Sequence, residues 1–519
     1  MINERSRIWV GLLCAGLLTV LAFVDGGCAA DTHTVCPSGC EYTSIQAAID
    51  NAQPGDTIEV HSGTYNEIVN VYQQLILKGI DTGGGKPVVD ARGSGSAITL
   101  NANGITVDGF TAINACNSGI LVYSNNNTVI NNTASNNYYG IYLYDSSTNT
   151  TLSGNTASSN DYYGIYLWSS STNTLIGNTA SNNSYGIYLW PSSDNTLTGN
   201  TVSNNSYGIL LESSNNNSLT GNTASNNGDG IYLSSSSDNT LAGNTASINS
   251  VGVYLDSSST NMLTGNAVNA NNGTGIHLYS SSNNSLTGNT ANANNGTGIH
   301  LYSSSNNNTL TTNTASNNSD YGIYLSSSSN NTLMGNTASN NNQGIRLRFS
   351  SNNNTLTGNT ASNNGFGIWL YNSSTNRIYN NYFDNTQNAH DNGLNIWNIS
   401  KTPGTNIVGG SWLGGNYWSD YAGEDTDGDG LGNTQIPHNP YGNIVDGGDW
   451  LPLVKAEEPL GRWDINEDCI VNFIDLTILS AHWLETPTSP FPRYDINEDG
   501  VVTFIDLAIL SAHWLETTC

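Results

Sequence analysis

Basic side chains are scarce in this 519-residue chain, which holds 12 Lys and Arg against 40 Asp and Glu and has a formal net charge of −28. No lysine or arginine occurs between Arg92 and Arg346. Nucleic acids and anionic membranes are bound through clustered basic side chains, so this composition excludes both as natural partners. No apolar run beyond the first 30 residues is long enough to cross a bilayer, which argues against a membrane span.

The first 30 residues have a different composition from the rest of the chain. Two arginines precede an apolar run over residues 8–24, and small residues follow it up to Ala30. This order is typical of a secretory signal, so we predict that residues 1–30 are a signal peptide and that the mature protein is secreted or held at the cell surface. A lipid anchor at Cys28 is the alternative, which Asp25 disfavours because such signals carry an apolar residue there.

Cysteine is also sparse, and five of the seven cysteines remain after the predicted signal. Export permits disulfides, but an odd number leaves at least one thiol unpaired in a monomer. Cys36 and Cys40 are close enough in sequence to form one disulfide near the N-terminus, and Cys469 and Cys519 would enclose the last domain. We predict that Cys116 is then a buried thiol in the core.

A short repeat fills the middle of the chain. Between residues 119 and 370 the pattern of glycine, β-branched residue, variable residue and aliphatic residue occurs twelve times, at intervals of 21 to 24 residues. That interval fits one turn of a solenoid and is too short for a propeller blade or a pair of helices. The glycines that begin the pattern are Gly119, Gly140, Gly164, Gly186, Gly208, Gly230, Gly252, Gly275, Gly298, Gly322, Gly344 and Gly367.

Apolar residues alternate within each repeat, as at Ile141 and Leu143, and Leu152 and Ala157 follow at wider spacing between polar turns. Alternation indicates strands, and short strands that coil and pair in parallel at about 4.8 Å form a parallel β-helix. We expect the asparagines at fixed offsets to stack along the axis and to adopt left-handed turn conformations. These are Asn155, Asn178, Asn200, Asn222, Asn244, Asn266, Asn289, Asn313, Asn336 and Asn359.

Residues 41–53 have the pattern of an amphipathic helix that ends at Pro54 and would cover the open end of the core. With the following Gly-Asp-Thr-Ile-Glu-Val and Gly-Thr-Tyr segments, this region resembles the start of pectate-lyase-like right-handed β-helices. The Gly-Ile-x-Leu and Ser-Ser-x-Asn-Asn-Thr-Leu repeats resemble the NosD family of periplasmic β-helix proteins, which is associated with copper-enzyme maturation. The resemblance implies a mainly β, right-handed parallel β-helix, with irregular turns over residues 31–118 and regular repeats over 119–400.

The last 120 residues have another organisation. Residues 401–455 form an acidic closing segment that resembles the end of many NosD-type proteins. In residues 456–519, the segment from Asp464 to Asp475 recurs 31 positions later, and each copy precedes an apolar helical pattern. This duplication resembles the α-helical, EF-hand-like dockerin type I module, which docks carbohydrate-active proteins onto cohesins. The resemblance implies a cohesin-like docking partner, although Phe-Ile pairs occupy the positions where dockerins usually carry small hydroxyl residues.

Both copies have the ligand spacing of a calcium loop, with oxygen donors at positions 1, 3, 5, 7, 9 and 12. We therefore predict Ca²⁺ as a cofactor. The ligands of the first site would be Asp464, Asn466, Asp468, the Ile470 carbonyl, Asn472 and Asp475, and those of the second Asp495, Asn497, Asp499, the Val501 carbonyl, Thr503 and Asp506. Cys469 takes the usual glycine position of the first loop. Asp425, Asp427 and Asp429 form a third candidate loop, for which an exposed acidic turn is the alternative.

The residues that flank the last leucine of each Gly-Ile-x-Leu strand should point outward on one face. Many of them are aromatic, and an uncharged row of rings is what stacking against sugars requires. We predict carbohydrate contacts for Tyr142, Tyr144, Tyr166, Trp168, Tyr188, Trp190, Tyr279 and Tyr302. The alternative is an aromatic ladder that only stiffens the sheet, as in a structural surface or adhesion protein.

Two carboxylates interrupt the aromatic columns, Glu212 and Asp256, two turns and hence about 9.6 Å apart. Such a pair could act as acid and base in an inverting hydrolase, but ordinary variation between repeats is the favoured explanation. Polysaccharide lyase chemistry would need the cations Arg346 and Arg348. His277 and His300 lack a visible third ligand for a metal, and the sequence therefore favours polysaccharide binding over catalysis.

Overall fold

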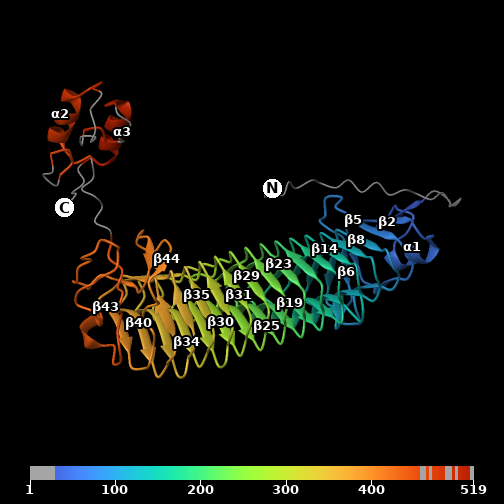
Figure 1. Ribbon diagram of the computed structural model, residues 1–519. Helices are drawn as coiled ribbons and strands as arrows, with labels where there is room; N and C mark the ends of the chain where they lie inside the picture. Colours follow the sequence, from blue (N-terminus) through green and yellow to red (C-terminus); the bar gives the residue numbers. More distant parts are fainter. Residues whose placement is uncertain (1–29, 456–462, 467–469, 486–493, 497–500, 515–519) are drawn as a thin grey trace, which may run out of the picture.

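The computed structural model describes residues 30–455, 463–466, 470–485, 494–496 and 501–514. Residues 32–418 coil into a long parallel β-solenoid whose strands form three sheets (Figure 1). Apart from one antiparallel pair, β44 (Thr402–Pro403) with β45 (Trp412–Leu413), the described strands of the sheets pair in parallel, as the alternating repeats predict.

Sheets A and C run the length of the solenoid with one strand per turn. Sheet A contains β1 (Thr32–Val35), β2 (Thr57–His61), β5 (Ile76–Ile80), β8 (Thr106–Asp108), β11 (Thr128–Ile130), β14 (Thr151–Ser153), β17 (Thr174–Ile176), β20 (Thr196–Thr198), β23 (Ser218–Thr220), β26 (Thr240–Ala242), β29 (Met262–Thr264), β31 (Ser285–Thr287), β33 (Thr309–Thr311), β35 (Thr332–Met334), β38 (Thr355–Thr357) and β41 (Arg377–Tyr379).

Sheet B is divided in two. Its parts are β3 (Thr64–Tyr65), β6 (Val88–Asp90), β9 (Thr111–Ile113), β12 (Thr133–Ser135), β15 (Thr156–Ser158), β18 (Thr179–Ser181), β21 (Thr201–Ser203), β24 (Thr223–Ser225) and β27 (Thr245–Ser247), then β36 (Thr337–Ser339), β39 (Thr360–Ser362), β42 (Tyr382–Asp384) and β46 (Tyr417–Trp418). Isolated parallel bridges at Ala267, Thr290 and Thr314 connect the two parts.

Sheet C carries the Gly-Ile-x-Leu pattern. It contains β4 (Val69–Val71), β7 (Ile98–Leu100), β10 (Ser118–Val122), β13 (Tyr139–Leu143), β16 (Tyr163–Trp168), β19 (Tyr185–Trp190), β22 (Tyr207–Glu212), β25 (Asp229–Ser234), β28 (Val251–Asp256), β30 (Ile276–Tyr279), β32 (Ile299–Tyr302), β34 (Tyr321–Ser326), β37 (Gln343–Arg348), β40 (Phe366–Tyr371) and β43 (Gln387–Asp391).

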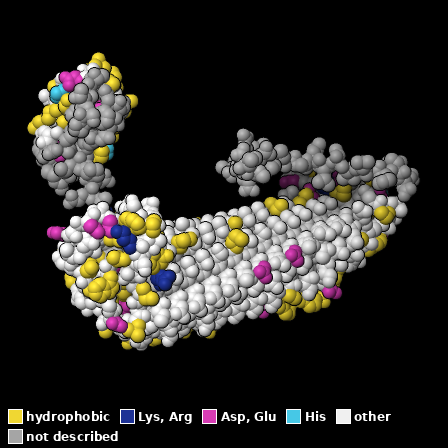
Figure 2. Space-filling view, viewed as in Figure 1, with side chains coloured by type: hydrophobic (Ala, Val, Ile, Leu, Met, Phe, Trp, Pro, Cys, Tyr) yellow, Lys and Arg dark blue, Asp and Glu magenta, His cyan; other side chains and the backbone are white. Residues whose placement is uncertain are grey.

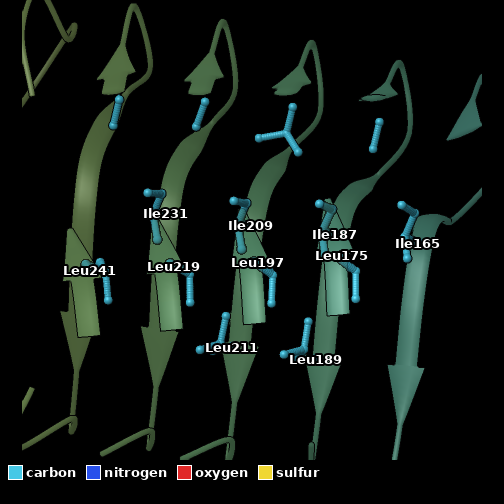
Figure 3. Packing of buried hydrophobic residues seen from close by; sticks show 14 of the residues in the cluster. Ile165, Leu175, Ile187, Leu189, Leu197, Ile209, Leu211, Leu219, Ile231 and Leu241 are labelled. Carbon is cyan, nitrogen blue, oxygen red and sulfur yellow. The ribbon is translucent and has the colours of Figure 1, made fainter. Parts of the chain in front are cut away.

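The core consists of identical layers, one per turn. In the turn that contains β17, β18 and β19, the inward side chains are Leu175, Ala180, Ile187 and Leu189, all fully buried. Figure 3 shows Ile187 beside Ile165 and Ile209, its equivalents in the neighbouring turns. The predicted filling of each layer by isoleucine, two leucines and alanine is confirmed, with occasional valine substitutions such as Val202.

The repeated glycine is required by close contacts inside the solenoid. A Cβ on Gly186 would lie 2.5 Å from the carbonyl oxygen of Gly208 and 2.9 Å from the Asn205 amide. Gly164 is equally confined, 2.5 Å from the oxygen of Gly186. Glycine and the isoleucine after it both face the interior, so the residue before the glycine is turned outward.

A buried asparagine ladder follows each of the three corners of the solenoid. At the corner between sheets A and B, the Asn178 amide donates to Asn200 Oδ1 at 3.0 Å and to the Leu152 carbonyl at 2.9 Å. The other ladders pass through Asn205, between sheets B and C, and through Asn195, between sheets C and A. The sequence pattern predicted only the first ladder. It also placed the left-handed conformation on these asparagines, whereas the preceding residue adopts it, as at Gly177 with φ 60°.

Helix α1 (Ile45–Asn51) covers the N-terminal end of the core and is shorter than the helix predicted over residues 41–53. Glu67 accepts hydrogen bonds from the backbone N–H groups of Ile45 and Gln46, at 2.8 and 3.1 Å. It thereby satisfies two of the backbone donors that the first turn of a helix leaves without a partner. A disulfide joins Cys36 and Cys40 in the segment before the helix. The prediction of a buried thiol at Cys116 is wrong, because this side chain lies exposed in a turn.

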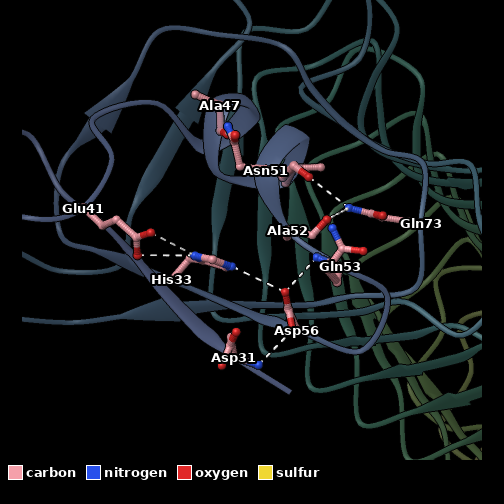
Figure 4. Close-up of polar contacts among 10 residues, drawn as sticks. Asp31, His33, Glu41, Ala47, Asn51, Ala52, Gln53, Asp56 and Gln73 are labelled. Atoms are coloured by element: carbon pink, nitrogen blue, oxygen red, sulfur yellow. Dashed lines mark hydrogen bonds and ion pairs between the residues drawn. The ribbon is translucent and has the colours of Figure 1, made fainter. Parts of the chain in front are cut away.

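A histidine holds the first strand to this cap (Figure 4). The two nitrogens of His33 lie 3.1 Å from Glu41 Oε1 and 3.4 Å from Asp56 Oδ2. Burial opposes protonation of His33, but the hydrogen bonds and negative charges of Glu41 and Asp56 outweigh it and raise its pKa.

The N-terminal cap should therefore loosen as the pH rises. Because the folded-state pKa of His33 is raised, its stabilising charge is fully present below the unfolded value of about 6.5 and is lost as the pH passes the folded pKa. Hydrogen exchange of the β1 amides, expressed as protection factors between pH 5 and 9, measures this loosening. A His33→Gln variant should remove most of the decrease in protection with pH. An equal decrease in the variant would show that His33 is not the titrating group.

At the other end, Asp449 closes the first asparagine ladder. Its buried carboxylate accepts from the Asn416 backbone at 2.7 Å and from Trp418 Nε1 at 2.9 Å. Trp397 packs beside Trp418, and both rings are almost fully buried. A short 3₁₀-helix (Pro440–Gly442) lies in the same closing segment.

The C-terminal module contains α2 (Phe473–Ala481) and α3 (Phe504–Ala512), each begun by a capping box. A small core joins them, made of Ile465, Val471, Leu479, Ile496, Val502 and Leu510. None of the helices among the described residues is long and apolar enough to cross a membrane.

Candidate functional site

The outer surface of sheet C carries the predicted aromatic columns, in the predicted register. Tyr142 pairs with Tyr166 and Tyr166 with Tyr188, and these rings stack with centroids 4.7 and 5.1 Å apart. All three are less than 10% exposed, so the expectation that they face solvent is wrong. They form a buried layer of rings outside the main core, and burial raises the pKa of each tyrosine.

Two flanking columns cover this layer. On one side Tyr144, Trp168 and Trp190 follow each other, and Trp190 is 39% exposed. On the other side lie Tyr139, Tyr163, Tyr185 and Tyr207. This second column was not predicted, although the tyrosine before each of the four consecutive glycines Gly140, Gly164, Gly186 and Gly208 is its signal.

Further along the solenoid, tyrosines and histidines continue the central column. Tyr254, His277, His300 and Tyr324 stack with centroid distances of 4.9, 4.8 and 4.5 Å. Burial lowers the pKa of His277 to about 4 and that of His300, with help from the His277 charge, to about 3, so both imidazoles are neutral at pH 7. Tyr279 and Tyr302 lie beside this stack, and Tyr302 is 41% exposed.

The structure places the two candidate catalytic carboxylates two strands apart on sheet C, as predicted. Glu212 accepts a hydrogen bond from the Tyr188 hydroxyl at 2.6 Å, and Asp256 one from Ser257 at 2.9 Å. Neither lines the grooves of about 680 and 610 Å³ that lie along this part of the solenoid. The geometry joins them to the aromatic layer and does not test the hydrolase hypothesis.

The predicted calcium loops are only partly described, because Asp468, Asn497, Asp499, Cys469 and Cys519 lie outside the described residues. Four carboxylates of the loops are fully buried, namely Asp464, Asp475, Asp495 and Asp506. Asp475 accepts from the backbone N–H groups of Ile465 and Asn472, at 2.7 and 2.8 Å. The first loop also contains Asn466 and the Ile470 carbonyl, and the second contains the Val501 carbonyl. The N-caps of helices α2 and α3 are Asn472 and Thr503.

In the third candidate loop, carboxylate oxygens of Asp425, Asp427 and Asp429 lie within 4.8 Å of one another. Lys401 forms an ion pair with Asp429, and Asp425 accepts from the backbone of Gly430 at 2.6 Å. This lysine supplies positive charge where a cation was predicted.

Three overlapping segments of the chain, residues 49–223, 192–314 and 293–423, match the family described as periplasmic copper-binding protein (NosD). The chain belongs to the NosD family. Residues 462–515 match the dockerin type I domain, so the second resemblance seen in the sequence is also confirmed. No curated protein matches the chain.

Several solved structures are similar to this NosD-family chain at low identity. The A-module of the Azotobacter vinelandii mannuronan C-5 epimerase AlgE4 is 16% identical, with a TM-score of 0.36, over 68% of this chain and 92% of the other. A mannuronic acid specific polysaccharide family 6 lyase from human gut microbiota is 12% identical, with a TM-score of 0.41, over 62% and 87% of the two chains. Pectate lyase Pel9A is 13% identical, with a TM-score of 0.31, over 46% and 77%.

The NosD description names copper, but the described residues of the repeats do not fit a copper site. His277 and His300 stack face to face with an interplanar angle of 5°, so their nitrogens do not converge on one point. The cluster of Cys36, Cys40 and His61 has its two sulfurs in a disulfide, which removes the thiolates that copper prefers.

A carboxylate that the sequence pattern did not single out is Asp229 of β25, next to the NosD-type glycine Gly230. It lines a groove of about 680 Å³ with Tyr207, Asn204 and Ser250, and burial raises its pKa to about 6. Asp229 stands where the preceding turns carry Tyr139, Tyr163, Tyr185 and Tyr207. This break in the repeat distinguishes Asp229 in the sequence.

Proposed function

We propose that this protein binds a polysaccharide outside the cell through the outer surface of sheet C and attaches to a larger assembly through its dockerin domain. The observation that carries the binding proposal is the row formed by Tyr144, Trp168 and Trp190, partly exposed rings on a buried layer of tyrosines. Stacking on a sugar needs an apolar face, and the indole N–H can also donate to a hydroxyl.

The rigidity of the row supports this function. Trp168 lies 4.5 Å from the Tyr144 ring and is paired in register with Trp190 on the next strand. Rings held by neighbours lose little conformational freedom when a ligand binds. Charged side chains are few over the middle of the solenoid (Figure 2), so a neutral polysaccharide bound there would remove few charged groups from water.

The dockerin domain supports attachment to a cohesin-type partner, and the four buried loop carboxylates support calcium as its cofactor. Oxygen donors are the ligands that this ion prefers, so the residues present fit it. Phe473 and Phe504 are 73% and 75% exposed at the start of the two helices, which favours a partner with apolar recesses. Export by the predicted signal peptide is part of the same proposal.

Replacing Trp168 and Trp190 together by alanine should weaken binding of a neutral glycan by about 1 to 3 kcal/mol, because stacking area is lost. The melting temperature should change little, since Trp190 contributes little to the core. A glycan array identifies the ligand, and calorimetry then compares both proteins. Trp450→Ala is the matched control, because Trp450 is 51% exposed and lies in the closing segment.

Equal affinities of the double variant and the parent would reject the binding surface. The aromatic columns would then serve only to stiffen the sheet, as expected of a structural or adhesion protein.

The hydrolase alternative stays a hypothesis that rests on Glu212 and Asp256. Release of new reducing ends from a bound glycan, lost in Glu212→Gln and Asp256→Asn, would support it. Binding without such release favours the proposal made here.

A further inference from the structure

Two arginines lie side by side on β37. Arg346 and Arg348 both point outward, and they are the first basic residues of the chain after Arg92. Arg346 continues the central column between Tyr324 and Trp369, and Arg348 continues the flanking column between Ser326 and Tyr371. Positive charge is therefore concentrated at one strand of an aromatic surface whose other charged side chains in these two columns, Glu212 and Asp256, are acidic.

Neighbouring side chains hold the guanidinium of Arg346 in place. It donates to the Tyr321 hydroxyl at 3.0 Å and to Gln343 Oε1 at 3.2 Å. Its central carbon lies 5.8 Å from the Tyr324 ring centroid and 5.5 Å from that of Trp369. An arginine fixed in this way keeps its remaining N–H groups in one orientation, which favours a planar anionic partner.

The positive charge of this pair is not neutralised within the described part of the chain. Neither arginine takes part in an ion pair with a described acidic residue. The Nε atoms of both are buried and have no hydrogen-bond partner. Arg348 instead packs over Phe349 at 3.9 Å. Two guanidinium groups that have no acidic partner attract a carboxylate strongly, because their N–H groups can donate charge-assisted hydrogen bonds to it.

We propose that Arg346 and Arg348 form a subsite for the carboxylates of acidic sugars, with Trp369 and Tyr371 of the next strand stacking on the sugar ring. Tyr371 is 37% exposed and lies in register with Arg348, so a ring and a charge are available together. This inference rests on the proposed function, to which it adds the substrate class. Free inorganic anions share the charge but cannot use the aromatic rings.

Titration calorimetry of the full-length protein with α-1,4-linked tetragalacturonate tests the subsite. The Arg346→Gln/Arg348→Gln double variant should bind at least about tenfold more weakly than the parent, because charge-assisted hydrogen bonds are lost. Arg348→Gln alone should already lose part of the affinity, and this single change in the flanking column, outside the central stack that holds Arg346, guards against misfolding. Arg377→Gln is the matched control, since Arg377 is exposed on sheet A and should leave binding unchanged.

The fully methyl-esterified tetramer should bind the parent at least about tenfold more weakly than the acid, and equally to parent and double variant. Inorganic sulfate at equal ionic strength should bind more weakly than the acid.

Equal affinity of parent and double variant for the acid, or of acid and ester for the parent, would overturn the subsite. Sulfate bound as tightly as the acid would indicate a site for free anions and would also overturn it. If the parent binds a neutral glycan but no tetragalacturonate, the subsite fails while the proposed function stands. If the tetramer binds through the arginines but Trp168→Ala/Trp190→Ala leaves the affinity for the neutral glycan unchanged, the tryptophan row fails instead.

Discussion

Addition of EGTA to the full-length protein is expected to abolish the thermal transition of the dockerin domain and to leave that of the solenoid unchanged. The module has a small core of six fully or nearly fully buried apolar residues, next to four buried carboxylates. Without a cation the negative charges of these buried carboxylates would be poorly solvated, which destabilises the folded state. The solenoid has its own stacked layers, so it should melt independently.

Calorimetry with and without EGTA measures both transitions, and added calcium should restore the lost one. Asp475→Ala and Asp506→Ala should each weaken the response to calcium, while Glu485→Gln, an exposed acid of the same module, should not. Two unchanged transitions in EGTA would contradict a calcium-dependent fold.

Asn205→Asp should be among the most destabilising single changes in the solenoid. The Asn205 amide donates to the Ala180 carbonyl and to Asn227 Oδ1, each at 3.1 Å, and accepts from the Asn183 backbone at 3.0 Å. A carboxylate would lose both donors and place a buried charge against two oxygens. A cost of about 3 to 5 kcal/mol is expected for an uncompensated buried charge.

Asn204→Asp is the matched control, because Asn204 is the exposed neighbour in the same turn. Melting curves should show a large decrease for Asn205→Asp and little change for Asn204→Asp. Similar melting temperatures for both variants would show that the ladder does not stabilise the fold.

The alternation of Ile187 and Leu189 was enough to predict strands, turns and the filling of each layer. Strict repetition explains this success, since every regular turn has the same pattern of apolar, glycine and turn residues. The burial of Tyr166 could not be read from alternation, because it depends on rings from two flanking columns that meet above it. The second and third asparagine ladders were equally visible as repeats but were not separated from the turn residues around them.

The sites were less predictable than the fold. Loop spacing identified Asp464 and Asp475, since calcium ligands come from one short segment. The ion pair of Lys401 with Asp429 joins residues 28 positions apart, and no periodic pattern connects them. The fixed orientation of Arg346 likewise depends on Tyr321 from the neighbouring turn, which only the register of sheet C brings near.

The asparagine corners and inward glycines make every turn interchangeable with the next, so the solenoid behaves as a spacer of fixed pitch. Adding or removing one repeat would leave the remaining contacts equivalent and would change the length by about 4.8 Å. Seven strand steps of sheet C separate Trp190 from Arg348, a distance of about 34 Å along the axis. Duplication of repeats would therefore change the span between the two proposed binding surfaces without altering the chemistry of either.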